Sequence, residues 1–579
     1  MGLYLSLNLT PTMPADQWDR FWCDSLQILR EFPLRLLRAS KYKTSYGFQK
    51  IWTDKLTASD KHGDYWEIAG DAESLIFAEP VRLYRNIEYY QQKWRRLQLK
   101  KQPAKDDPLF CKPQDFAKTS GDIPLSGIQV FHKKTQGYPY HYAIVAIATL
   151  AEHRFPLHSL AWGDLRPVGC NSVRQWLSSL YNENLMLPIC LDAARLWNRI
   201  EGACGDISTT MKRFEERFIG TAAQRIHRML AESRETTMQK LAEDLLHYET
   251  VTLGLMDLSK SFLEATDDLD LFLDLIELRN SLAASKKARK KDQSIIKRED
   301  ILRMLVKGFV TYSQWQGEEI RTLRRWLDLE GGVVQTINAT LLKMSTPDFF
   351  DYYCSEQYLL EAFVRREPAK LEKFNQVLRD TLEENLETEE VVKDFVRTME
   401  ERADAQTRRF EPVADDADNG FVRFIKEEAS LQSELREPLT EENVAVVGRY
   451  FGYHVHQMQR IASGMENAKN LTDPTGNNQR GVLLAIMHQN DVRLLEDALL
   501  EIERTDDTEL LKLFASLAPC LFTELFRLAA PIIFGEGFEM GRSALWHILN
   551  KPIWWQTFRE HRNDGLSEER GKVRRKRDK

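Results

Sequence analysis

Apolar residues recur every three to four positions from residue 191 to residue 558, interrupted by short turns and charged loops. This spacing places them on one face of a helix and predicts a long succession of amphipathic helices. The candidate helices cover residues 192–203, 208–233, 235–259, 267–282, 297–314, 318–328, 347–365, 368–384, 389–407, 421–435, 440–465, 482–489, 491–504, 507–517 and 520–533. The short intervals between the last helices are typical of antiparallel pairs in a bundle or solenoid, although no consensus repeat of fixed period accompanies them.

The first 190 residues mix strand and helix patterns. Alternating leucines predict a strand over residues 3–9, and Pro14 and Asp16 suit the first turn of a helix that ends at Pro33. The further elements expected are a strand pair over residues 46–52 and 65–68, a helix over residues 81–99, a buried apolar helix over residues 140–152, a loop over residues 162–169 and a helix over residues 172–181.

The predicted fold class is mainly α, with a small α+β N-terminal domain followed by multi-helical domains that resemble a bundle or solenoid. At roughly 100–200 residues per domain, 579 residues suggest three or four folding units. The expected boundaries are an α+β domain at 1–99, a proline-containing linker at 100–126, a mostly helical domain at 127–204, a helical domain at 205–410, a C-terminal helical domain at 421–558 and a basic, disordered tail at 559–579. The acidic segment 411–420 is a candidate hinge between the last two helical domains.

Composition places the chain among soluble proteins with large cores, since 43% of residues are hydrophobic and 29% are charged. The seven cysteines are odd in number and form no CxxC pair, which favours reduced thiols and a cytoplasmic location. The longest run without a charged residue, 135–151, is shorter than the roughly 20 residues that a spanning helix needs, so we expect no membrane contact.

The glycine, histidine and acidic groups in the sequence do not have the spacing of known cofactor or metal motifs. Gly535, Gly537 and Gly541 have neither the spacing of a phosphate-binding loop nor its lysine. The histidine pairs lack the i, i+4 spacing of ligands on one helix face, and the acidic cluster at residues 267–274 fits the opening turns of a helix. We therefore expect no cofactor and no metal.

Three residues are the candidates for catalysis: Asp71, His141 and Asp164. They would face a cleft between the N-terminal domain and residues 138–187, where a carboxylate or an imidazole can transfer protons. The structural alternative makes the two aspartates turn caps after glycine and makes His141 a hydrogen-bonded core residue.

Two further groups point to partners. Trp554 and Trp555 form either an aromatic binding patch or the start of a terminal helix that docks on the core. The tail could contact phosphates through Lys572, Arg574, Arg575, Lys576 and Arg577, although it has no aromatic residue for base stacking. The favoured interpretation is a non-catalytic scaffold or accessory subunit that binds proteins. The alternatives are an enzyme with a site between the N-terminal domain and residues 138–187, and a nucleic-acid-associated protein that uses the tail.

Overall fold

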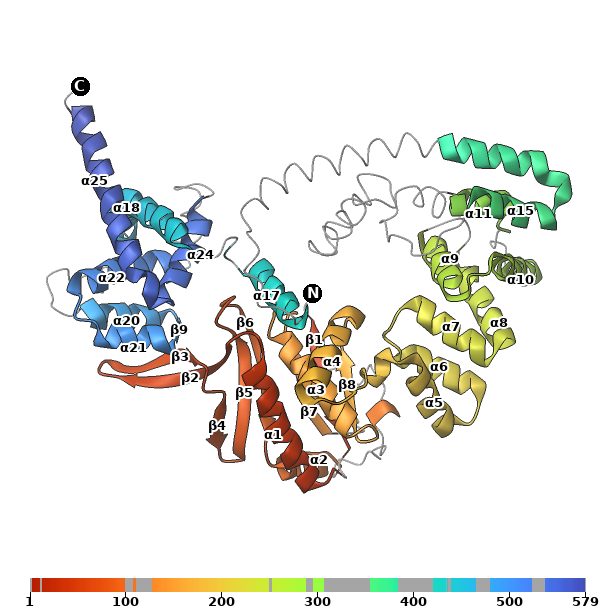
Figure 1. Ribbon diagram of the computed structural model, residues 1–579, viewed down its shortest axis with the longest axis horizontal. Coiled ribbons are helices and arrows are strands. Elements are labelled where there is room, and N and C mark those ends of the chain that lie inside the picture. The colour runs from red at the N-terminus through yellow and green to blue at the C-terminus, as the bar shows by residue number, and fades with distance from the viewer. Residues whose placement is uncertain are drawn as a thin grey trace. The chain divides into compact units, whose positions relative to one another are not determined.

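The computed structural model describes residues 3–10, 13–98, 108–110, 128–248, 253–287, 295–306, 355–383, 420–433, 435, 439–464, 479–522 and 537–577. The chain divides into two compact units (Figure 1). The α/β unit comprises Met1–Ile189 and Ala414–Lys579, and the helical unit comprises Cys190–Val413. Helices predominate, and all but one of the described strands lie before residue 164, so the chain is mainly α with a small N-terminal β part. Most of the linker 100–126, the hinge 411–419 and Gly535 lie outside the described residues.

A three-stranded antiparallel sheet opens the α/β unit. Its central strand is β1 (Tyr4–Leu9), flanked by β7 (Ile128–Lys134) and β8 (Ser159–Gly163). The three alternating leucines of β1 are fully buried, which confirms the predicted strand. The sequence analysis did not predict β7 or β8 and expected a loop where β8 ends. Because β1 pairs with both strands, one sheet joins the segments 1–99 and 127–204, which the sequence pattern separates.

Helix α3 (His141–Arg154) packs against this sheet and is buried on every side from His141 to Glu152. Its apolar residues surround the whole helix, and such a helix has to be covered all round. The predicted buried helix is thus confirmed. Helices α1 (Ala15–Glu31) and α4 (Pro167–Tyr181) both contact α3. Helix α1 runs between the two prolines that the sequence analysis identified as its limits.

A second sheet has the strand order β4-β5-β2-β3-β9, with β6 paired to β5. Its strands are β2 (Leu36–Thr44), β3 (Gly47–Thr53), β4 (Thr57–Asp60), β5 (Gly63–Asp71), β6 (Phe77–Tyr84) and β9 (Leu494–Leu495). The two predicted aromatic strands exist as β3 and β5, but each pairs with β2 and not with the other. The predicted helix 81–99 begins only at α2 (Ile87–Gln98), because Val81 and Leu83 alternate in β6 and are buried against β5.

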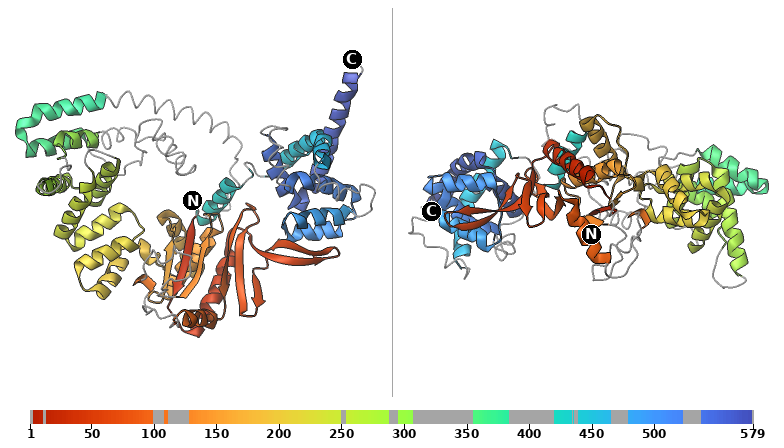
Figure 2. Two further views of the ribbon diagram at one scale, coloured as in Figure 1. Left: turned by 180° about the vertical axis from the view of Figure 1, so that it is seen from behind. Right: turned by 90° about the horizontal axis from the view of Figure 1, so that it is seen from below.

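The C-terminal helices cover the hairpin formed by β2 and β3. These helices are α18 (Glu441–Gly464), α20 (Gln479–Gln489), α21 (Glu496–Arg504), α22 (Thr508–Phe522), α24 (Gly537–Leu549) and α25 (Trp555–Arg577). Figure 2 shows the hairpin leaving the rest of its sheet and running along these helices. Ile51 of the hairpin shares one apolar core with Leu495, Phe514 and Trp555. The short strand β9 pairs in parallel with β3 and closes this contact.

Helix α25 continues to Arg577, so the expectation of a disordered tail from residue 559 is wrong. The helix is held against α18 by glycines that bring the two backbones together. A Cβ atom on Gly452 would lie 2.1 Å from the carbonyl oxygen of Arg562, and one on Gly565 would lie 2.4 Å from that of Arg449. Such close approach needs small residues spaced by four, as Gly448 and Gly452 are, and it stabilises a helix whose own sequence is strongly polar.

The helical unit is built of short helices. They are α5 (Ala193–Cys204), α6 (Ile207–Arg217), α7 (Ala222–Glu232), α8 (Arg234–Asp244), α9 (Leu253–Thr266), α10 (Leu269–Lys287), α11 (Arg298–Leu305) and α15 (Glu356–Arg366). The predicted helices 208–233 and 235–259 are each interrupted. In the first, Thr221 and Gln224 form a capping box that starts α7 as a new helix.

Candidate functional site

A cavity of about 130 Å³ lies in the α/β unit where β1, α3 and α4 begin. It is lined by Leu3, Gln136, Gly137, His141, Tyr142, Val145, Arg166, Cys170 and Gln432. Gln432 belongs to α17 (Gly420–Gln432) and donates a hydrogen bond to the carbonyl oxygen of Gly137 at 3.1 Å. A cavity of about 150 Å³ holds a benzene molecule, so this space suits a ligand of about six non-hydrogen atoms or fewer.

A tight turn before α3 forms one wall of the cavity. Gln136 and Gly137 have φ angles of 60° and 75°, and the Tyr138 amide donates to the Thr135 carbonyl oxygen at 3.2 Å. Two consecutive positive φ angles define a type I′ turn. The φ of 75° favours glycine at the second position, and a Cβ atom there would lie 2.5 Å from Leu3 Cδ1, so that Leu3 would have to shift. Glutamine is unusual at the first position, and the left-handed conformation costs it about 1 kcal/mol.

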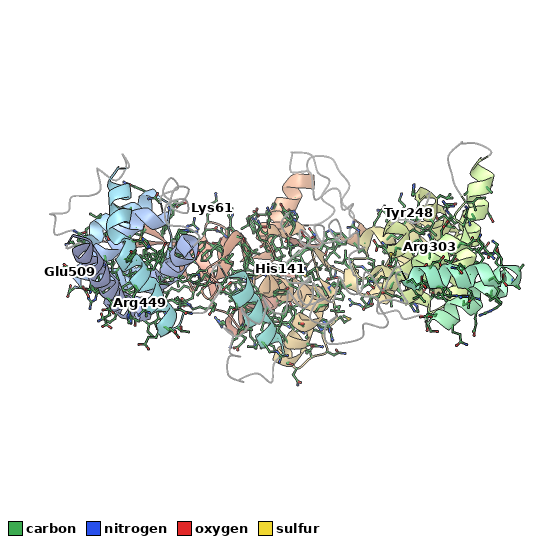
Figure 3. All side chains as sticks on the ribbon, turned by 90° about the horizontal axis from the view of Figure 1, so that it is seen from above. Lys61, His141, Tyr248, Arg303, Arg449 and Glu509 are labelled. Carbon is green, nitrogen blue, oxygen red and sulfur yellow. The ribbon has the colours of Figure 1, made fainter. Side chains whose placement is uncertain are left out.

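His141 begins α3 and is 4% exposed (Figure 3). Its Nδ1 lies 2.7 Å from Thr135 Oγ1. Burial, aided by the positive charge of Arg166, lowers the pKa of His141 to about 4, so the ring is neutral at pH 7. Within the described residues Nε2 makes no hydrogen bond. This second ring nitrogen is therefore available to the cavity.

Arg166 precedes the first turn of α4, where Pro167 occupies the first helical position. Its exposed guanidinium forms neither an ion pair nor a hydrogen bond with any described residue. The amide groups of Val168 and Gly169, which open the helix, likewise have no acceptor among the described residues. This end of α4 therefore presents a full positive charge and the positive end of the helix dipole to one place.

The cavity does not have the groups of a catalytic centre. Burial raises the pKa of the Cys170 thiol to about 12, so it is no thiolate nucleophile at neutral pH. None of the described residues that line the cavity is a carboxylate. Glu152 is close enough to act on Cys170, but its carboxylate accepts hydrogen bonds from the amides of Ala161 and Ile189.

The structure does not bring the three catalytic candidates together. Asp164 accepts a hydrogen bond from the Tyr4 amide at 2.6 Å, and Asp71 accepts from the amide and hydroxyl of Ser74, both at 2.7 Å. Burial raises the pKa of Asp71 to about 6. Among the described residues, no hydrogen bond or ion pair joins Asp71, His141 and Asp164. Asp71 thus caps a local turn, Asp164 ties the start of β1 to the end of β8, and of the three only His141 lines the cavity.

The acidic cluster of α10 is occupied by arginine. Arg366 contacts the carboxylates of Asp270, Asp274 and Glu277 at 3.4, 2.8 and 3.0 Å. No group of three or more metal-ligating side chains occurs in the described part of the chain. These carboxylates thus hold α15 against α10.

A second candidate site is the outer face of the β2–β3 hairpin, which we call the hairpin face: Lys41, Lys43, Tyr46 and Phe48. Lys43 stands directly opposite Phe48 across the two strands, so their side chains share one face. Phe48 is 61% exposed and Tyr46 at the turn is 44% exposed. Lys41 and Lys43 are exposed and have no ion-pair partner in the described structure. The sequence analysis missed this site, although basic residues interleaved with aromatic ones were its signal.

The structure places the two tryptophans of the predicted aromatic patch at the start of α25 and the basic residues of the predicted tail at its end. Trp555 is buried, and its indole N–H donates to the Ile548 carbonyl oxygen at 3.0 Å, so it is a core residue that docks α25. Trp554 is half-buried against the same core. Lys572 and the four basic residues from 574 to 577 lie on the last turns of α25, and their side chains are outside the described ones.

No family model, curated protein or solved structure matches this chain. In the part of the chain that the structure describes, no helix is both long and apolar enough to cross a membrane. Function therefore has to be inferred from the residues themselves.

Proposed function

We propose that this protein is a non-catalytic interaction protein, a scaffold or accessory subunit, that binds a partner protein through the hairpin face. The exposure of Phe48 carries the proposal, because a large aromatic side chain outside the core is typical of an interface anchor. Tyr46 adds a second aromatic ring at the same tip. The opposite face of the hairpin, with Gln49 and Ile51, is buried, so the tip is held rigidly for binding.

Charge around the hairpin favours a protein partner over a nucleic acid. Carboxylates from the C-terminal helices and their loops pair with basic residues in the hairpin and at its base: Asp491 with Lys50, Glu496 with Lys55, and Asp497 with Arg35. A phosphate backbone following the hairpin would meet these negative charges. A protein with an apolar pocket and an acidic rim would instead take the aromatic tip in the pocket and pair with Lys41 and Lys43 at the rim.

Two finer parts of the proposal concern organisation and location. We propose that the short helices of the helical unit form a solenoid-like array, supported by contacts of α7 with both α8 and α9 and of α8 with α10. We also place the protein in the cytoplasm. Cys23, Cys170, Cys190 and Cys204, which form no disulfide, support this location.

The test is affinity capture of the tagged full-length protein from its native cells, at low and high salt and with nuclease. The variant carries Tyr46→Ser and Phe48→Ser, and the matched control carries Leu157→Ser, which removes another apolar side chain that is 63% exposed. We expect one stoichiometric protein that resists nuclease, is retained by the control and is lost with the hairpin variant. The purified partner should then bind the hairpin variant at least tenfold more weakly. Equal binding by both variants would contradict the proposal.

The nucleic-acid alternative gives a different outcome in the same experiment. Captured material that disappears with nuclease and with deletion of residues 572–579 would move the function to the basic end of α25. A salt-sensitive affinity that falls linearly on a logarithmic salt scale would accompany it.

A further inference from the structure

The cavity beside His141 gathers hydrogen-bond donors that no described protein acceptor uses. They are the Arg166 guanidinium and the Gln136 side-chain amide, and Arg166 directly precedes the first turn of α4. We propose that this cavity binds a small oxyanion, of the size of inorganic phosphate or a short carboxylate. This small-ligand site is independent of the hairpin face.

Arg166 and the start of α4 supply the positive charge. The guanidinium has five donors in a planar fork that matches the geometry of phosphate and carboxylate oxygens. The free amides of Val168 and Gly169 lie within three residues of Arg166, and a helix N-terminus stabilises an anion through such amides and its dipole.

His141 is the independent sign of a ligand. Its ring is 4% exposed, lines the cavity and leaves Nε2 without a hydrogen bond to any described residue. Nε2 is therefore the polar atom of this side chain that is left to the cavity. A bound molecule with an oxygen atom could form a hydrogen bond with it.

The hydrogen bonds around Thr135 bear on which ring nitrogen of neutral His141 holds the proton. The Leu3 carbonyl oxygen accepts the amides of Thr135 at 2.9 Å and Gln136 at 3.3 Å. The Thr135 hydroxyl lies 3.4 Å from that oxygen, to which it can donate, and 2.7 Å from His141 Nδ1, where the direction of the bond depends on the tautomer. In the tautomer that carries the proton on Nε2, Thr135 donates to Nδ1 and Nε2 is a donor toward the cavity.

The absence of acidic residues among the described lining of the cavity favours an anion over a cation as the ligand. None of the described lining residues is acidic, and the carboxylate of neighbouring Glu152 is engaged by two backbone amides. A cation would meet the unpaired Arg166, whereas an anion would neutralise it. The cavity of about 130 Å³ admits phosphate but is too small for a nucleotide.

The experiment is calorimetric titration of the full-length protein with inorganic phosphate, and separately with acetate, against sodium chloride at matched ionic strength. Three variants accompany the wild type: Arg166→Gln, His141→Asn and, as the matched control, Arg174→Gln. Arg174 lies two turns further along α4 and donates to Asn171. We expect saturable binding of phosphate, acetate or both, weakened at least tenfold by Arg166→Gln and unchanged by Arg174→Gln.

His141→Asn tests the site without changing its formal charge. Its amide can keep the hydrogen bond with Thr135 but is too short to donate into the cavity as Nε2 does, so we expect a further loss of several-fold in affinity. Phosphate binding without acetate binding would identify a phosphate site, and the reverse a carboxylate site. The absence of saturable binding by either anion, or equal affinity of wild type and Arg166→Gln, would overturn the proposal.

Discussion

Arg366 in the helical unit and Arg166 in the α/β unit lie in contrasting surroundings. In the helical unit Arg366 contacts three carboxylates of α10, and Arg298 pairs with Glu277 and Glu367. In the α/β unit Arg166 has no partner among the described residues, and the buried His141 beside it leaves one nitrogen unused. Paired charges of the first kind hold helices together. Groups of the second kind, without a protein partner and lining one cavity, remain available to a ligand.

The contact between α15 and α10 and the contact between α25 and α18 also differ in kind. Helix α15 reaches α10 through arginine and carboxylate side chains, whereas α25 reaches α18 through glycines that place the backbones against each other. A charged contact tolerates small displacements because long side chains adjust. A glycine contact does not, since any added atom meets backbone.

The largest expected effect is the pH dependence that comes from His141. Its folded pKa of about 4 lies below the unfolded value of about 6.5, so the unfolded chain takes up the proton first as pH falls. This contribution to stability is complete above pH 6.5 and is lost between pH 6.5 and 4, by on the order of 3 kcal/mol. His141→Asn should flatten this part of a plot of the thermal midpoint against pH.

Two other buried groups titrate in the same range and serve as internal references. Burial lowers the pKa of His547 to about 3, which adds a loss of the same sign. The raised pKa of Asp71 acts in the opposite direction, because its protonated form is favoured in the folded state as pH falls below about 6. His547 and Asp71 are present in both the wild type and the His141→Asn variant. The difference between the two pH profiles of the thermal midpoint therefore reports His141 alone. Identical pH profiles would mean that His141 is solvated in solution.

Adding a methyl group to the α18–α25 contact is the next largest change. Gly452→Ala places an atom 2.1 Å from a backbone oxygen, and we expect a loss of about 2 kcal/mol as the helices separate. Hydrogen exchange of peptides from α18 and α25 would measure it. The matched control is Gly202→Ala in α5, where the added atom has nothing within 4 Å and should stabilise by about 0.5–1 kcal/mol. Equal effects of the two substitutions would refute the close contact.

Removing the charge of Arg366 should cost less. Arg366→Met leaves Asp270, Asp274 and Glu277 without this cation, and we expect a loss of about 1–2 kcal/mol because the network is partly exposed. The loss should shrink at high salt. Hydrogen exchange in α10 and α15 at two salt concentrations measures both effects, and a loss that ignores salt would argue for packing alone.

Arg166→Met should change stability least, by less than about 0.5 kcal/mol in buffer without oxyanions. The reason is that no described residue pairs with Arg166. Thermal unfolding in chloride buffer measures this, with Arg366→Met as the contrasting variant. A loss as large as that of Arg366→Met would show that Arg166 has a structural partner, and the contrast between the two arginines would fail.

The sequence predicts correctly those helices and strands that are determined by the pattern of residues within their own segment. The alternating leucines predict β1, and an apolar run of helical length predicts α3. The sequence predicts a helix where β6 forms, because Val81 and Leu83 are buried only through the pairing of β6 with β5. The pairing of β1 with β7 and β8 joins residues 119 to 158 positions apart, and no pattern within either segment specifies such a partner.

The candidate sites divide in the same way. His141 could be singled out because a histidine at the start of an apolar helix is conspicuous. Arg166 could not, because an arginine before a proline-started helix is ordinary until its surroundings show that no carboxylate reaches it. Phe48 alternates with buried residues as any strand residue does, and only the cover over the opposite face shows which side remains exposed.

The parallel pairing of β3 with β9 also has a consequence for folding during translation. Ile51 can pair with Leu494 only after more than 400 further residues have been synthesised, which takes roughly 20–90 s at the usual rate of translation. During that interval the emerging hairpin has an open strand edge and an uncovered apolar face, the features that lead nascent chains to aggregate. The described core residues of the helical unit all lie between the two segments that form the α/β unit, so the helical unit can fold before the hairpin is covered.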